Sequence, residues 1–138
     1  MVKTFTGGCL CGAVRFECSG EPVMTGHCHC EDCRRTSGTG HSSHMAVPEQ
    51  SVALTGKTSV YDRPADSGNV VSRHFCGRCG APVYSKNAAM PGIVFLRAST
   101  FDDLEVFKPQ MHVYASRAPS WDKPQDGLPA FDLMPKGF

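Results

Sequence analysis

The chain has 138 residues, 41% of them hydrophobic, and a formal net charge of +1. This composition excludes a disordered chain, and the length predicts one domain over residues 1–138. The near-neutral charge gives no argument for nucleic acid or a membrane as a partner. No apolar run approaches the roughly 20 residues of a membrane span, and the first residues contain no apolar signal segment. We therefore expect a cytoplasmic protein, in which clustered cysteines are metal ligands or catalysts in preference to disulfides.

The predicted elements are mostly short strands joined by turns. Strands are expected over residues 13–18, 51–55, 59–61, 70–75 and 93–97, the last buried on both faces. Single helical turns are expected over residues 31–36 and 100–104. Five prolines beyond residue 108 argue against a long C-terminal helix, and within that segment Tyr114 and Trp121 are expected to pack in the core. The overall prediction is a mainly β fold with an irregular C-terminal segment.

Seven of the eight cysteines form three tight motifs, C-x-C, C-x-C-x-x-C and C-x-x-C. They are Cys9 and Cys11, then Cys28, Cys30 and Cys33, then Cys76 and Cys79. Such spacings let neighbouring sulfurs reach one zinc ion at about 2.3 Å. A structural zinc takes four ligands, so the seven sulfurs divide into four and three, for two zinc ions per chain. Cys18 has no partner at this spacing and is expected to be buried.

Glycines indicate which four cysteines group together. Gly12 follows Cys11 and Gly80 follows Cys79, and glycine tolerates the left-handed backbone that turns amides back towards a ligating sulfur. We therefore pair the first and last motifs as a closed site. The middle motif then forms a three-thiolate site with one open position, as in catalytic zinc centres.

The sequence leaves other roles open for these cysteines and for the residues near them. Disulfides, inert buried thiols, a redox cluster or an iron–sulfur cluster would use the same residues. A histidine could close the second site, the candidates being His27, His41 and His44, whereas His29 alternates with two cysteines and should point away from the metal. Arg34 and Arg35 either offset the negative charge of three thiolates or are simply solvated.

The three motifs occur as G-C-L-C-G-A-V-R at residues 8–15, C-H-C-E-D-C-R-R at 28–35 and F-C-G-R-C-G at 75–80. In this order they resemble the glutathione-dependent formaldehyde-activating enzyme family, whose domain is shared with centromere protein V. The resemblance implies an Mss4-like fold, a tent-like β-sandwich with short helical turns and zinc sites at the sheet ends. It also implies a structural zinc on Cys9, Cys11, Cys76 and Cys79, and a second zinc on Cys28, Cys30 and Cys33.

The resemblance further implies a zinc-dependent carbon–sulfur lyase that acts on a thiol–aldehyde adduct such as S-hydroxymethylglutathione, with the three-cysteine site as its catalytic centre. Its partners would be a small thiol such as glutathione and formaldehyde or another small aldehyde. The alternatives are a zinc protein that carries a small thiol without turnover and a structural zinc domain for a protein partner. Water, Glu31 or a histidine could donate the proton. The candidate partners for the thiol's carboxylates are Lys57, Arg63, Arg73, Arg97 and Arg117.

Overall fold

The computed structural model describes residues 4–135; residues 1–3 and 136–138, the ends of the predicted domain, lie outside the described residues. The strands are β1 (Phe5–Gly8), β2 (Arg15–Cys18), β3 (Met24–Cys28), β4 (Ser42–Pro48), β5 (Val52–Thr55), β6 (Ser59–Pro64), β7 (Val70–Phe75), β8 (Pro82–Asn87), β9 (Ile93–Arg97) and β10 (Met111–Val113). The described part contains one α-helix, α1 (Glu31–Ser37), and 3₁₀ turns over Glu49–Ser51, Ala98–Thr100, Leu104–Val106, Ala115–Arg117 and Ser120–Asp122.

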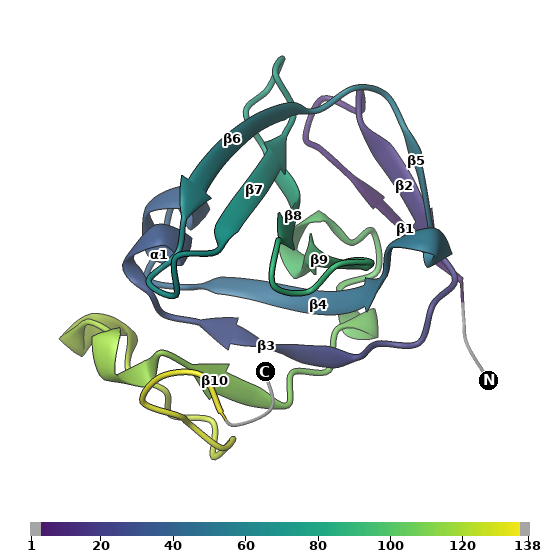
Figure 1. Cartoon of the computed structure of the whole chain (residues 1–138). Coiled ribbons are helices and arrows are strands. Elements are labelled where there is room, and N and C mark those ends of the chain that lie inside the picture. The colour runs from purple at the N-terminus through teal and green to yellow at the C-terminus, as the bar shows by residue number, and fades with distance from the viewer. Residues whose placement is uncertain (1–3, 136–138) are drawn as a thin grey trace.

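The strands form two sheets (Figure 1). One has three strands in the order β1-β2-β5, and the other has seven in the order β10-β3-β4-β9-β8-β7-β6. Neighbouring strands are antiparallel except β10, which runs parallel to β3 at the edge of the larger sheet. Figure 1 shows the small sheet at the right-hand side of the larger one, and α1 at the opposite, left-hand side. The predicted mainly β fold is confirmed.

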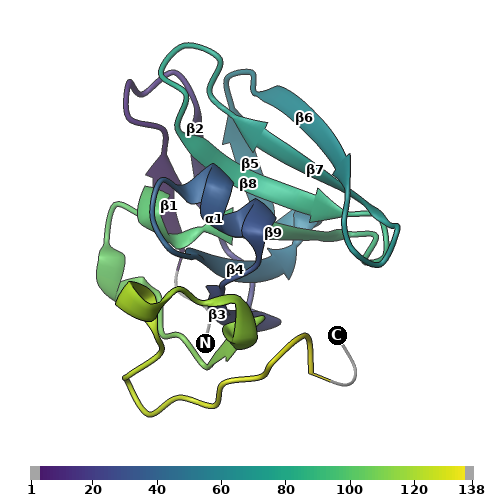
Figure 2. The same cartoon turned by 90° about the vertical axis from the view of Figure 1, so that its left-hand side faces the viewer.

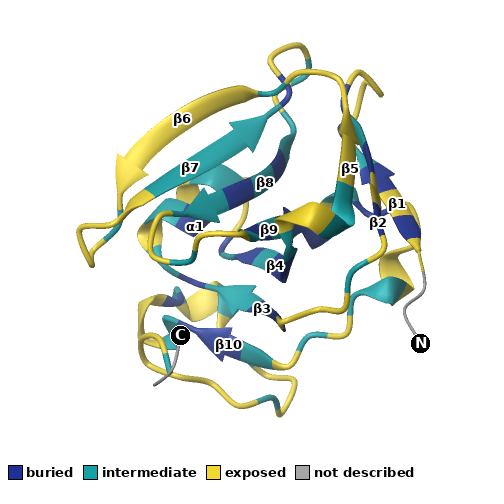
Figure 3. Cartoon of the chain, turned by 45° about the vertical axis from the view of Figure 1, so that its right-hand side comes forward, coloured by how far each residue is buried: buried dark blue, intermediate teal, exposed yellow. Residues whose placement is uncertain are grey.

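The core lies between the two sheets. Alternate residues of β1 and β2 face it, including Phe5, Phe16 and Cys18, because successive side chains of a strand point to opposite faces. From the larger sheet, buried residues of β4, β8 and β9 meet them, and Figure 3 shows these strands carrying the buried segments. Phe101 packs against Phe5 with ring centroids 4.8 Å apart. Cys18 is fully buried here, as expected.

The helical turn expected over residues 31–36 is present as α1. The side chain of Cys30 caps its first turn by accepting a hydrogen bond from the Cys33 N–H, and Gly38 ends it with φ of 81°. The turn expected over residues 100–104 is wrong, since the chain forms 3₁₀ turns before and after it. In Figure 2, α1 faces the viewer and the C-terminal segment passes beneath it.

The chain changes sheet near residue 56, and the expected position of Trp121 needs correction. Strands β5 and β6 flank Gly56 but belong to different sheets, so the chain changes sheet at this glycine, whose φ is 89°. Trp121 is not in the core, because 71% of it is exposed. A single 3₁₀ turn has no extended apolar face, and the inward position of this turn is taken by Asp122, which contacts His41. Within residues 4–135, no helix is long and apolar enough to cross a membrane.

Candidate metal centres

The first cysteine cluster joins two hairpin turns that are far apart in the sequence. Cys9 and Cys11 lie in the β1–β2 turn, and Cys76 and Cys79 lie in the β7–β8 turn. Their four sulfurs are within 4.8 Å of one another, and the Cys11 sulfur is 3.7 Å from those of Cys9 and Cys76. Zinc–sulfur bonds of about 2.3 Å in a tetrahedron place sulfurs roughly 3.8 Å apart. The observed distances match that geometry and exclude disulfide bonds, which need about 2.05 Å.

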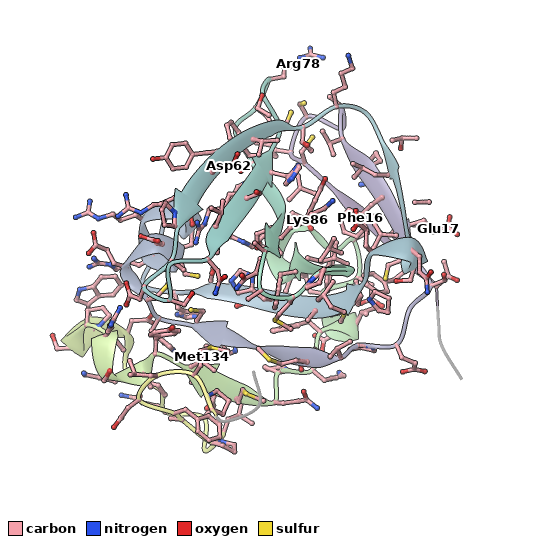
Figure 4. All side chains as sticks on the ribbon, viewed as in Figure 1. Phe16, Glu17, Asp62, Arg78, Lys86 and Met134 are labelled. Carbon is pink, nitrogen blue, oxygen red and sulfur yellow. The ribbon has the colours of Figure 1, made fainter. Side chains whose placement is uncertain are left out.

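Both turns have the same local design. Val14 donates its backbone N–H to the Cys9 sulfur at 3.2 Å, and Cys79 donates to the Cys76 sulfur at 3.4 Å. Gly12 and Gly80 take the left-handed backbone, with φ of 84° and 80°, which few other residues adopt without strain. Figure 4 shows Arg78, within the second turn, at the opposite end of the molecule from Met134. The cluster therefore lies far from the C-terminal segment.

The electrostatics of the first cluster favour a cation. Backbone N–H groups of Ala81 and Cys11 lower the pKa of Cys79 to about 6. The Ala13 N–H acts in the same direction on Cys11, but desolvation and the other three thiols outweigh it and raise the pKa of Cys11 to about 11. Four thiolates this close repel one another unless a positive charge lies between them. A divalent ion that prefers sulfur fits this donor set.

The second cluster lies where β3 passes into α1. Cys28 is the last residue of β3, Cys30 caps the helix, and Cys33 is buried in its first turn. Their sulfurs are within 4.8 Å of one another, and this group contains no fourth residue. Hydrogen bonds from Cys28 and Cys30 hold the pKa of Cys33 well below its usual value. Hydrogen bonds with Cys30 and Cys33 raise the pKa of Cys28 well above its usual value. One negative charge is thus shared among three thiols, and a divalent cation would allow all three to ionise.

Of the histidines considered as a fourth ligand, His44 contacts the second cluster. Its Nε2 is 3.7 Å from the Cys33 sulfur but also 2.6 Å from the Ser42 hydroxyl. Burial lowers the pKa of His44, so its ring is neutral. His27 and His41 lie elsewhere, bonded to Ser43 and Asp122.

Arg97, at the end of β9, is a buried cation beside the second cluster. Only 4% of it is exposed, and its Nη2 donates to the Thr36 hydroxyl at 3.2 Å. Burial lowers the pKa of Arg97, while the thiols, Cys33 first, raise it. Arg35, by contrast, pairs with Glu31 at 3.0 Å with most of its side chain in solvent. Arg34 and Arg35 were expected either to offset the thiolate charge or to be solvated, and Arg97 was not predicted in this role. The one feature of the sequence that could have indicated Arg97 was a charged residue at the end of a predicted apolar strand.

Tyr114 and Arg117 stand next to the second cluster. Val113 pairs with Cys28, which brings Tyr114 to the end of β3. Tyr114 has φ of 53°, a strained value for a residue with a side chain, and such strain is common at functional sites. Arg117 lies 5.2 Å from the centre of its ring and pairs with Asp66 at 2.8 Å. Tyr114 is therefore part of the surroundings of the cluster and not of the main core.

The fold and these clusters define a mainly β protein with two cysteine centres able to hold metal ions. The model of the glutathione-dependent formaldehyde-activating enzyme family matches residues 4–117, and the chain belongs to this family. The resemblance inferred from the three motifs is thereby confirmed.

Two relatives and one solved structure illustrate the relationship. A Halomonas elongata protein named "Putative glutathione-dependent formaldehyde-activating enzyme" is 31% identical over 121 residues, which cover 83% of this chain and 77% of the relative. A Schizosaccharomyces pombe protein named as an uncharacterized lyase is 26% identical over 101 residues, or 73% of this chain and 71% of the relative. The crystal structure of a Rhodobacter sphaeroides protein has a TM-score of 0.57 at 16% identity and covers 91% of this chain and 98% of its own. That likeness concerns the fold alone.

Proposed function

We propose that the chain is a cytoplasmic, single-domain carbon–sulfur lyase of the S-hydroxymethylglutathione type, with a zinc ion at each cysteine cluster. The observation that carries this proposal is the group of three thiols at Cys28, Cys30 and Cys33, which offers three ligands and leaves a fourth position for a substrate. Membership of the family and the lyase name of one relative support the reaction class. The free state of all eight cysteines supports a reducing compartment.

The reaction joins a thiol to an aldehyde, or separates them in reverse. The thiol sulfur bonds to the aldehyde carbon, and the carbonyl oxygen takes up a proton equivalent to the one the thiol loses. Zinc bound by the three cysteines would lower the pKa of an incoming thiol. The chain's own residues then position the substrate, because a thiol held beside the aldehyde gains from proximity. Arg97 balances the negative charge of the thiolates from inside the protein.

Glu31 is a poor candidate for the proton donor. Its carboxylate is paired with Arg35 on the solvent side of α1. Tyr114 is within the electrostatic reach of the thiols, since burial first and the Cys28 and Cys30 charges second raise the pKa of its hydroxyl. The Tyr114 hydroxyl is therefore protonated at neutral pH. We assign proton delivery to this hydroxyl or to water reaching the site beside it.

Replacing Cys30 by serine tests the proposal. We expect the zinc content to fall by one ion per chain and the rate to fall to the uncatalysed level. That level is not zero, because formaldehyde and thiols also react without protein. Metal analysis and exchange rates between glutathione and its formaldehyde adduct, measured with and without protein, provide the readout. Cys18→Ala, a change of a buried cysteine outside both clusters, should keep both the metal and the rate. A Cys30→Ser protein that lacks the second zinc yet matches the parent's rate would refute the mechanism.

Arg117→Gln should raise KM for glutathione about 10–100-fold with little change in kcat, because a charged hydrogen bond to a substrate carboxylate contributes roughly 1.5–3 kcal/mol. Arg15→Gln is the matched control. Arg15 has the same side-chain exposure of 42% and also pairs with an aspartate, Asp102, but belongs to the three-stranded sheet. Steady-state kinetics of both variants provide the test, because KM should rise in Arg117→Gln and stay unchanged in Arg15→Gln. Equal KM values in the two variants would show that Arg117 does not bind the substrate.

The contact between His44 and Cys33 favours a second candidate function. If the His44 ring left Ser42 and completed the zinc tetrahedron, the second site would be closed, and the chain would be a structural zinc domain for a protein partner. X-ray absorption on the zinc-loaded protein distinguishes the two. Three sulfurs with an exchangeable light atom fit the lyase, whereas three sulfurs with an imidazole that persists in saturating thiol fit the structural domain.

A further inference from the structure

A second group of potential ligands lies on the opposite face of β3 from the three-cysteine cluster. His27 and His29 flank Cys28, so their side chains point to the other side of the strand. There they line a cavity of about 350 Å³ beneath the C-terminal segment, together with His41, His112, Asp122 and Asp126. His112 comes from β10, and Asp122 and Asp126 come from the segment that follows it. None of these residues has a role in the proposed lyase reaction.

The tautomers of this group follow from its hydrogen bonds. The Nε2 atom of His112 is 3.0 Å from both carboxylate oxygens of Asp126, which can only accept, so this nitrogen carries a hydrogen. The other ring nitrogen of His112, Nδ1, is 2.9 Å from Nε2 of His29. Nε2 of His29 is therefore engaged with His112, and Nδ1 is the ring nitrogen left to face another partner.

That nitrogen, Nδ1 of His29, is the unusual feature. The His29 ring is 1% exposed, and its Nδ1 has no hydrogen-bond partner among residues 4–135. The nearest charged group is the Oδ2 atom of Asp122 at 3.9 Å. A buried ring nitrogen without a hydrogen-bond partner is unfavourable, and a cation between it and the carboxylate oxygen would satisfy both atoms. His41 points its Nδ1 at the same Asp122 oxygen, at 2.5 Å.

The three atoms are arranged as metal ligands. Ligand atoms from His29, His41 and Asp122 are all within 4.8 Å of one another. Nitrogen and oxygen atoms bound to one ion at about 2.1 Å stand roughly 3–3.5 Å apart, so modest side-chain rotations would suffice. The chain from His29 through His112 to Asp126 matches the outer carboxylate–histidine support that commonly orients a metal-binding imidazole.

Gly40 makes room for the carboxylate. A Cβ atom at this position would lie 2.3 Å from Oδ2 of Asp122 and 2.8 Å from its Cβ. In contrast, the neighbouring group of His27, His112 and Asp126 needs no ion. His27 already bonds to Ser43, and both nitrogens of His112 have partners.

We propose that His29 Nδ1, His41 Nδ1 and Asp122 Oδ2 bind one divalent transition-metal ion, such as Zn²⁺ or Fe²⁺, in addition to the ions of the two cysteine clusters. Two imidazoles and one carboxylate form a donor set that such ions favour, with positions left open towards the cavity. The ion would tie β3, the loop before β4 and the C-terminal segment together. This site is independent of the proposed lyase function, because its ligands are not sulfur and lie on the other face of the sheet.

Cobalt is the probe that separates this site from the thiolates. The tag-free full chain, with its cysteine clusters loaded with zinc, is titrated with Co²⁺ while bound metal and visible absorption are followed. Zinc resists replacement by cobalt at its thiolate sites. We expect one further Co²⁺ per chain, without the charge-transfer absorption of a sulfur–cobalt bond. Asp122→Asn and Gly40→Ala should each weaken this binding at least tenfold, and Asp132→Asn, an exposed aspartate of the same segment, should not.

Three results would overturn the proposal: no additional cobalt on the parent chain, additional cobalt with sulfur charge transfer, or equal cobalt affinity in the parent and Gly40→Ala. The alanine variant keeps all three ligands and obstructs only the position of the carboxylate, so it remains informative if Asp122→Asn folds poorly. Zinc content at the cysteine clusters serves as the check that each variant is folded, and it does not depend on lyase activity.

Discussion

Replacing Cys11 by alanine is expected to leave the chain largely unfolded at physiological temperature. The Cys11 side chain faces solvent, and exposed positions away from special features tolerate substitution with little change in stability. Cys11 is exceptional because its sulfur lies 3.7 Å from those of Cys9 and Cys76, in the cluster that joins the two sheets. Structural zinc in small domains contributes about 10–16 kcal/mol of apparent binding free energy. That is as large as the whole free energy of unfolding of a typical domain.

Thermal unfolding with parallel zinc analysis checks this expectation. Cys11→Ala should lose one zinc ion per chain and at least roughly 15 °C in Tm. Cys18→Ala is the control, since Cys18 is fully buried but belongs to neither cluster. Its loss should cost about 1–2 kcal/mol through the small cavity it leaves, with the zinc content unchanged. The exposed cysteine should thus matter more than the buried one. A Cys11→Ala protein as stable as the parent would show that the first cluster holds no structural metal.

Arg97→Met is expected to lower the zinc affinity of the second cluster about 10–100-fold, the usual effect of losing a supporting residue around a metal site. Methionine fills much of the same volume but removes the buried guanidinium that faces Cys33 and its neighbours. Removing one partner of a buried charge pair also destabilises the fold, typically by about 3–5 kcal/mol. We therefore expect a lower Tm that additional zinc partly restores.

Competition with a chelator of known affinity measures the effect, since the two clusters should release zinc at different chelator concentrations. Only the weaker site should shift in Arg97→Met. Arg35→Met is the matched control, because Arg35 is close in sequence to Cys33 but pairs with Glu31 in solvent. It should change the affinity less than threefold. If both variants shifted alike, the effect would not be specific to Arg97, and the arginines of α1 would also offset the thiolate charge, which is one of the two roles that the sequence left open.

The sequence alone was sufficient to predict the fold class and the grouping of the cysteines. Alternating residues around Phe16 specify a strand, and the helical turn at residues 31–37 is short because Cys30 caps it and Gly38 ends it. These signals are local, so they can be read without the fold. Gly12 and Gly80 mark the two turns that bring four sulfurs together, and both have the expected left-handed backbone. The sequence between these two turns, by contrast, does not predict how they come together in the fold.

Tertiary structure alone decided what surrounds the sulfurs. Arg97 comes to the second cluster because β9 pairs with β4 and sets it opposite His44, and Tyr114 comes there because β10 pairs with β3. The same pairing brings His112 to His29, 83 residues earlier, and the following segment carries Asp122 to His41. A parallel edge strand of three residues is too short for its sequence to predict the strand with which it pairs. Short spacings and the flanking glycines therefore predicted which cysteines lie together, whereas the buried cation and the histidine–aspartate group depended on contacts that only the folded chain creates.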